Sequence, residues 1–151
     1  MTAPRLTQAE RDRIAAADGI LRGYRWRQRR LAELEEEISE ITYRMTGVHG
    51  VSIDPDRIPG TPGSGTSREA RLLSMIERRD DLETEADALR RHIAAVDAYL
   101  GSYDQETESI VRDYYMTDRS YDYICRQHYM SRESIRRRVI AVLRSFPIMT
   151  A

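Results

Sequence analysis

The stretch "YMSRESIRRRVIAVLRSF", residues 129–146, decides the fold of the C-terminal part of the chain. Ser131 stands directly before a helical pattern, and its hydroxyl can accept a hydrogen bond from an amide of the first turn. With about 100° between successive residues, a helix over 132–146 has one apolar face. That face consists of Ile135, Val139, Val142, Leu143 and Phe146. The sequence therefore predicts a capped amphipathic helix that packs this face on a neighbouring element.

The residues just before this stretch supply the neighbour. Residues 121–128 follow a second serine, Ser120, and their apolar positions are spaced by threes and fours. Only about three residues separate this helix from the next one, which is typical of a helix-turn-helix. A further helix is expected at about 104–116.

The second helix of this motif is rich in arginine. Between residues 126 and 144 there are six Arg and one acid, Glu133, whereas the net charge of the whole chain is −1. Arginine binds phosphates and guanine edges, a helix N-terminus offers free amides to phosphate, and such a helix docks in the major groove. Two packed helices with solvated arginines also occur in proteins that bind no DNA. The candidate DNA-binding residues are Ser131, Arg132, Glu133, Ser134, Arg136, Arg137 and Arg138.

Two long helical patterns precede this motif. Residues 7–46 predict one helix with a heptad-like apolar stripe, and residues 68–100 predict a second, with Thr66 or Ser67 as its N-cap. In the second helix, residues seven apart predict a coiled-coil seam over four heptads. The seam holds Leu72, Met75, Leu82, Ala86, Leu89, Ile93, Val96 and Leu100, with Arg79 as its one polar member.

Between the two long helices, residues 47–67 are rich in Gly and Pro, which predicts a flexible linker. The linker would allow the second helix to fold back on the first. Alternatively, each helix could pair with another chain, and the sequence does not decide between these arrangements.

These patterns predict an all-α fold in which long coiled-coil helices precede a C-terminal helix-turn-helix domain. The expected boundaries are 1–46 for the first coiled-coil helix, 47–67 for the linker, 68–100 for the second helix and 101–151 for the DNA-binding domain. No apolar run approaches the ~18 residues of a membrane span. There is no signal-peptide core at the N-terminus, and a single cysteine excludes an internal disulfide framework. We therefore expect a cytoplasmic protein without a membrane partner.

The C-terminal stretch "DQETESIVRDYYMTDRSYDYICRQHYMSRESIRRRVIAVLRSF", residues 104–146, looks like the region-four helix-turn-helix of bacterial sigma factors. Over about 24–146, the chain resembles the ArpU/RinA-type phage transcriptional regulators. It shares their coiled-coil helix, a break such as "RIPGTPGSGTS", a second coiled helix and the C-terminal motif.

This resemblance implies an activator of late genes in phages, prophages and related elements. It makes "SRESIRRR" the start of the recognition helix, with Arg132, Glu133, Arg136 and Arg137 as base readers. One departure concerns the turn, where this chain has Tyr129 in place of the frequent Gly. A residue other than Gly in the left-handed conformation costs ~1–2 kcal/mol. A different turn geometry is therefore an open alternative.

Other motifs point to simpler roles. Cys125 and His128 form a C-x-x-H pair, but zinc needs four ligands, and the other histidines lie in different segments. The acidic run Glu35–Glu37 is interpreted as a solvated helix face. The stretch "RGYRWRQRR", residues 22–30, is either a second nucleic-acid contact or a polar face on which Trp26 covers a partner helix, and we favour the latter. We find no phosphate-binding loop and no nucleophile paired with a base, and so expect neither an enzyme, a metal nor a cofactor.

The leading hypothesis is thus a sequence-specific transcriptional regulator that binds double-stranded DNA and forms a homo-oligomer through its coiled coil. A small terminase-like packaging protein would also join a helix-turn-helix to an oligomerising helical region. A third possibility is a sigma-like module that binds RNA polymerase without reading DNA itself.

Overall fold

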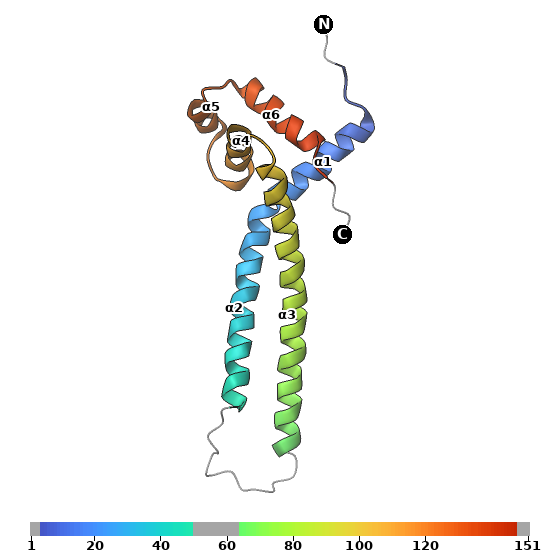
Figure 1. The fold of residues 1–151 in the computed structure, drawn as a ribbon, viewed down its shortest axis with the longest axis vertical. Coiled ribbons are helices and arrows are strands. Elements are labelled where there is room, and N and C mark those ends of the chain that lie inside the picture. The colour runs from blue at the N-terminus through green and yellow to red at the C-terminus, as the bar shows by residue number, and fades with distance from the viewer. Residues whose placement is uncertain (1–3, 50–63, 148–151) are drawn as a thin grey trace. The chain divides into compact units, whose positions relative to one another are not determined.

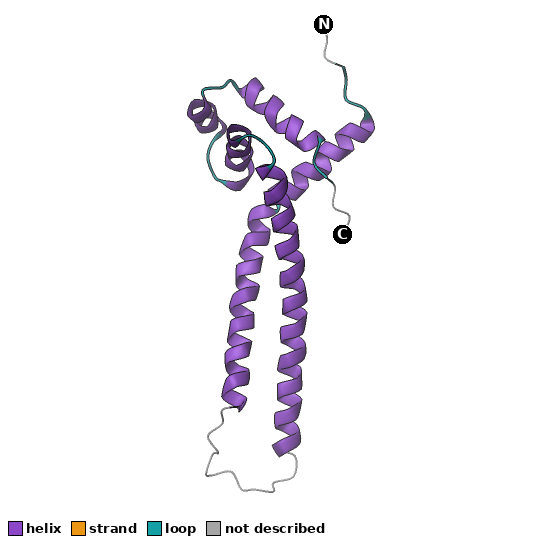
Figure 2. Ribbon diagram, in the orientation of Figure 1, coloured by secondary structure: helices purple, strands orange, loops and turns teal. Residues whose placement is uncertain are grey.

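The described residues of the computed structural model, 4–49 and 64–147, fold into α-helices and contain no strand (Figures 1 and 2). This confirms the predicted all-α class. The helices are α1 (Gln8–Arg22), α2 (Tyr24–His49), α3 (Ser64–Gly101), α4 (Gln105–Met116), α5 (Tyr121–His128) and α6 (Arg132–Arg144).

The chain divides into two compact units whose boundaries lie inside α2 and α3. The first unit combines residues 1–27 with 92–151, and the second comprises 28–91. This differs from the predicted domains, which placed all of 1–46 with the coiled coil and began the last domain at 101. The reason is that both long apolar stripes change partners partway along, so that α1 and the end of α3 pack with the C-terminal helices.

The first unit is built around a core to which each of the six helices contributes. α1 packs against α4 and α6, while α4, α5 and α6 pack against one another. Burial of these apolar side chains is the main favourable term that fixes α6 in place. The buried core residues are Ala17, Leu21, Tyr24, Val96, Leu100, Ile110, Val111, Tyr115, Ile124, Ile135, Val139, Val142, Leu143 and Phe146.

The second unit is an antiparallel pair formed by residues 28–49 of α2 and 64–91 of α3 (Figure 1). Its buried residues are Leu34, Ile41, Met45, Leu82 and Ala86. Predicted seam residues of α3 therefore pack on α2 of the same chain. The last three predicted seam positions, Ile93, Val96 and Leu100, instead join the core of the first unit.

Ion pairs flank the seam of the second unit. Arg30 pairs with Glu85 at 2.9 Å, Arg78 with Glu37 at 3.0 Å and Arg90 with Glu35 at 3.3 Å. Two members of the acidic run Glu35–Glu37 thus bind arginines of the facing helix.

The prediction of one helix over 7–46 is corrected by a break at Gly23. α1 ends at Arg22 and α2 begins at Tyr24. Arg27 folds back over the break, and its Nη1 donates to the Ile20 carbonyl at 3.0 Å. A Cβ atom at Gly23 would lie 2.6 Å from Arg27 Nη1, so only Gly leaves room for this contact.

The start of α3 also differs from the prediction. α3 begins at Ser64, so Thr66 and Ser67 lie inside the helix and do not cap it. Pro62 is the last proline before this helix, and no residue after it prevents helical hydrogen bonding. Because α2 continues to His49, the helices take up both ends of the predicted linker. Its remaining residues, 50–63, lie outside the described part of the chain.

None of the helices described here combines the length and the apolar character that crossing a bilayer requires.

Candidate nucleic-acid interface

Both predicted serine caps are present in the pair α5 and α6. The Ser120 hydroxyl accepts a hydrogen bond from the Tyr123 amide at 3.1 Å, and the Ser131 hydroxyl accepts one from the Ser134 amide at 3.2 Å. Each bond satisfies an amide that the first helical turn leaves without a backbone partner. These caps fix where α5 and α6 begin, and three residues, 129–131, connect the two helices.

The connection contains a strained residue. Tyr129 has φ 54° and ψ 42°, the left-handed conformation, and no other non-glycine residue in the described ranges has a positive φ. The Met130 amide donates to the Cys125 carbonyl at 3.0 Å, which closes the end of α5. The turn therefore keeps the conformation that Gly would favour, although Tyr129 occupies it. Its side chain is 96% exposed and packs on nothing that would offset the strain.

The apolar face predicted for α6 is buried as expected. Its five members, Ile135, Val139, Val142, Leu143 and Phe146, are all buried. The Tyr99 hydroxyl donates to the Val142 carbonyl at 2.7 Å and so anchors the second half of the helix. This packing leaves the opposite side of the first two turns exposed to solvent.

Arg132 connects the start of α6 to α5. Its guanidinium donates to Asp122 and lies 5.7 Å from the centroid of the Tyr121 ring. The Tyr121 hydroxyl donates to the Arg132 carbonyl at 3.0 Å. The hydrogen bond from Arg132 holds the pKa of Asp122 below its ordinary value. Arg132 thus helps to position the helix as well as being exposed on it.

Glu133 and Arg137 form an exposed pair one turn apart. Their side chains meet at 2.7 Å, and each is 74% exposed. An exposed ion pair of this kind is worth only about 0.3–0.5 kcal/mol. Both groups are therefore available to an incoming ligand at small cost.

The next two arginines have different environments. Arg138 turns toward α4, where it donates to Glu106 at 3.2 Å and to the Thr107 hydroxyl at 3.3 Å. Arg136 forms no ion pair or hydrogen bond within the described residues. It borders a surface hollow of about 460 Å³ with Tyr121, Arg132 and Glu133.

The fold reduces the positive charge that the sequence concentrates at 126–144. Arg132, Arg138 and Arg144 pair with acids from α5, α4 and α1, the last through Glu10 at 2.8 Å. Among the described residues, Arg126 and Arg136 are the two arginines of this stretch without an ion pair. The structure therefore does not present an unbroken basic patch here.

A buried polar cluster that the sequence did not indicate links α4 to α5. Asp113 accepts a hydrogen bond from Arg119 at 3.0 Å, and its other carboxylate oxygen lies 3.2 Å from His128 Nε2. The Asp113 and His128 side chains are only 11% and 10% exposed. His128 of the C-x-x-H pair thus faces a carboxylate, and no group of three metal-ligating side chains occurs in the described residues.

The basic stretch 22–30 is engaged within the chain. Arg22 pairs with Asp18 and Arg25 with Asp118, both within ion-pair distance. Trp26 is 58% exposed, so within the described residues it is not covered by another helix of the same chain. A ring at this surface position gains little from packing within the described chain.

Neither a protein-family model, a curated protein nor a solved structure matches the chain. The functional argument thus depends on the geometry above.

Proposed function

We propose that the protein is a sequence-specific DNA-binding transcriptional regulator of the ArpU/RinA type. In this proposal α5 and α6 are a helix-turn-helix, and α6 is the recognition helix. The observation that carries it is the two-sided character of α6. One face is buried in the core, while the first two turns expose Glu133, Arg136 and Arg137 beyond a three-residue turn.

This arrangement meets the physical needs of base reading. A side chain that reads a base edge must project from a rigid element, because bidentate hydrogen bonds tolerate little displacement. The Ser131 cap, the Tyr121–Arg132 hydrogen bond and the buried face together hold α6 in one orientation. The free amides of its first turn add a favourable site for a phosphate.

The contacts of individual arginines divide their proposed roles. Arg137 lies at the centre of the exposed face and can exchange Glu133 for a guanine edge. Arg136, without an ion pair in the described structure, is assigned to a backbone phosphate. Arg138 is bound to Glu106 and Thr107, so we now assign it to positioning α6 on α4.

The experiment compares the affinities of alanine variants for a selected site and for a scrambled duplex at several salt concentrations. Arg137→Ala should weaken the selected site by ~1–3 kcal/mol and leave scrambled DNA nearly unchanged. Arg136→Ala should weaken both duplexes and lower the salt slope by about one. Glu133→Ala should alter base preference, since a carboxylate accepts from cytosine N4. If all three variants bind both duplexes as the parent does, α6 is not a recognition helix.

A polymerase-binding module that does not read DNA is the second candidate. The pairing of Arg132, Arg138 and Arg144 with acids favours it, because the DNA-facing charge is smaller than the sequence suggested. The same titrations separate the candidates, since this module would show no preference for any duplex.

We also propose that the second unit is an intramolecular coiled coil. Leu34 and Leu82 are buried between α2 and α3 of one chain. Because these side chains are already buried within one chain, they cannot also pack on a second chain. A homo-oligomer through the same residues therefore requires α2 and α3 to separate. Light scattering of the full chain tests this, because an intramolecular seam alone gives a monomer mass.

A further inference from the structure

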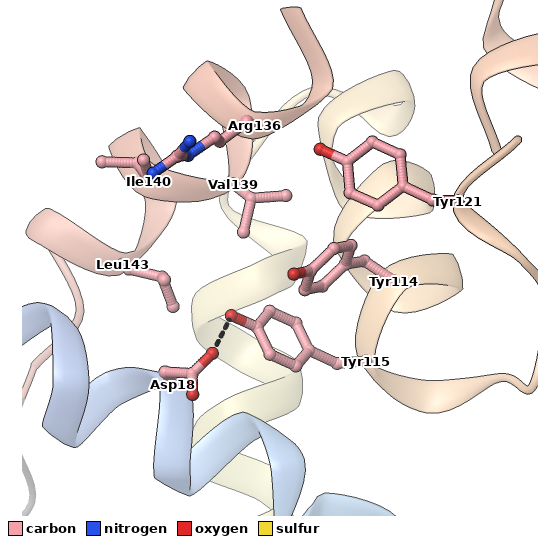
Figure 3. A pocket seen from close by; sticks show the side chains of 8 residues that line it. All are labelled: Asp18, Tyr114, Tyr115, Tyr121, Arg136, Val139, Ile140 and Leu143. Carbon is pink, nitrogen blue, oxygen red and sulfur yellow. Dashed lines mark hydrogen bonds between the residues drawn. The ribbon is translucent and has the colours of Figure 1, made fainter. Parts of the chain in front are cut away.

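A cavity of about 200 Å³ lies among α1, α4, α5 and α6 of the first unit (Figure 3). Its wall on α6 is aliphatic and consists of Val139, Ile140 and Leu143. Ile140 is half-buried. An apolar cavity of about 150 Å³ can hold benzene. The space is thus of the right size for one substituted ring.

The opposite wall is aromatic. The Tyr114 ring lies 4.7 Å from that of Tyr115 and 5.8 Å from that of Tyr121, with interplanar angles of 75° and 86°. Edge-to-face pairs of this kind are the preferred arrangement of aromatic rings. A flat apolar group can therefore lie between these rings and the aliphatic wall.

The three tyrosine hydroxyls differ in their partners. Tyr115 donates to Asp18 at 2.6 Å, and Tyr121 donates to the Arg132 carbonyl at 3.0 Å. Tyr114 forms no hydrogen bond in the described part of the chain, and Figure 3 shows its hydroxyl directed toward the cavity. The Tyr114 hydroxyl is thus a donor that a ligand can use.

The charged groups of the cavity favour an anion. Arg136 borders this cavity and also the neighbouring hollow, and its guanidinium has no ion-pair partner among described residues. The Asp18 carboxylate at the other end is already bound by Tyr115 and by Arg22 at 2.8 Å. Burial raises the pKa of Tyr121, and the charge of Arg136 opposes that rise only in part.

We propose that this cavity binds a small aromatic carboxylate. Its ring lies between the tyrosines and the aliphatic wall of α6. Its carboxylate accepts hydrogen bonds from the Arg136 guanidinium and the Tyr114 hydroxyl. Charge-assisted bonds from arginine to carboxylate are among the strong hydrogen bonds in proteins, and this one supplies the selectivity for an anion.

The test titrates the isotopically labelled full chain with benzoate, without DNA, and follows the methyl signals of Val139, Ile140 and Leu143. Benzoate should shift them along a saturable curve. Benzamide, which has the same shape without the charge, and acetate, which has the charge without the ring, should each bind at least fivefold more weakly. Fivefold corresponds to about 1 kcal/mol. The absence of a saturable shift, or a smaller preference over either analogue, overturns the proposal.

Two arginine variants form the matched pair. Arg136→Gln should weaken the binding of benzoate at least fivefold. Arg126→Gln also removes an arginine without an ion pair in the described structure, and it should change the affinity for benzoate less than twofold. Tyr114→Phe should weaken benzoate while leaving the ring contacts in place. A loss below fivefold for Arg136→Gln, or an equal loss for Arg126→Gln, contradicts the assignment. Because no DNA is present, this result and that of the DNA titrations are independent.

Discussion

At the residue scale, the strain at Tyr129 is the feature most open to a simple test. The left-handed conformation costs a non-glycine residue ~1–2 kcal/mol, and this side chain is almost fully exposed. Tyr129→Gly should therefore raise the free energy of unfolding by about 1 kcal/mol, less the extra entropy of the unfolded chain. Urea unfolding followed by circular dichroism measures this.

The control for Tyr129→Gly is the same replacement at Gln127, in the last turn of α5. Gln127→Gly should lower the free energy of unfolding by up to about 1 kcal/mol, since Gly is a poor helix former. Equal destabilisation by both replacements would mean that the turn does not adopt the left-handed conformation in solution.

The raised pKa of Tyr115 predicts that the protein loses stability in alkaline solution. Burial, followed by its hydrogen bond to Asp18, raises its pKa well above the ordinary 10.0. Its contribution to stability is fully present below pH 10 and is lost as the pH rises further, because the unfolded chain releases the phenol proton first. In this pH range, the ionisation of Tyr115 lowers the free energy of unfolding by up to about 1.4 kcal/mol per pH unit.

Unfolding at pH 8–11, followed by Trp26 fluorescence, measures the effect of Tyr115. Tyr115→Phe should unfold more easily at pH 8 and lose stability less steeply above pH 10. Tyr43→Phe, at a position 80% exposed, serves as the control and should follow the parent. Parallel curves for Tyr115→Phe and the parent would contradict the role of this phenol.

Some single-residue features could be predicted from the sequence and others could not. The Ser120 and Ser131 caps are local, since each bond spans three residues. The ion pair between Arg144 and Glu10 joins residues 134 apart, and no local pattern indicates it. The sequence therefore shows where the arginines are but not how many of them are paired with acids from distant segments.

At the element scale, Gly23 and Gly19 allow a matched comparison in α1. A Cβ at Gly19 meets nothing within 4 Å, whereas one at Gly23 meets the Arg27 side chain. Gly19→Ala should stabilise by about 0.5–1 kcal/mol through helix propensity. Gly23→Ala should stabilise the protein less than Gly19→Ala does, because Arg27 must give up its hydrogen bond to the Ile20 carbonyl.

The same replacement in an Arg27→Ala background completes this test by thermal unfolding. Without the guanidinium, Gly23→Ala should stabilise the protein as much as Gly19→Ala does. If Gly23→Ala stabilises equally in both backgrounds, the contact between Arg27 and the break has no energetic role.

The seam of the second unit predicts a contrast between two leucines of α3. Leu82 is 1% exposed and Leu73 is 59% exposed. Leu82→Ala should destabilise by about 2–5 kcal/mol, because it leaves a cavity between the helices. Leu73→Ala should change stability by less than about 0.5 kcal/mol. Similar thermal shifts for the two variants would contradict the packing of α2 on α3.

The elements show where periodicity is informative. The bounds of α5 match the prediction, because capping and spacing define a short helix well. The break at Gly23 was missed because a stripe spaced by threes and fours continues across it. Arg27 and Gln28 are polar residues that interrupt that stripe. They lie at the boundary between the two units, so the interruption was a sequence signal for that boundary.

At the scale of the whole molecule, the main correction concerns which segments fold together. Sequence order placed α1 with the coiled-coil helices, yet its residues Ala17 and Leu21 are fully buried in the core that holds α6. A stripe shows that a helix face is apolar but does not identify its partner. The fold class could thus be predicted, whereas the composition of the two units could not.

Selection of bound duplexes from a random pool, carried out in parallel with the parent protein and Arg137→Ala, tests the central claim most directly. The account predicts that the parent enriches a defined motif and that Arg137→Ala enriches the same motif with one position relaxed. No enriched motif for the parent, or an unchanged motif for Arg137→Ala, would contradict the claim that α6 reads DNA through Arg137.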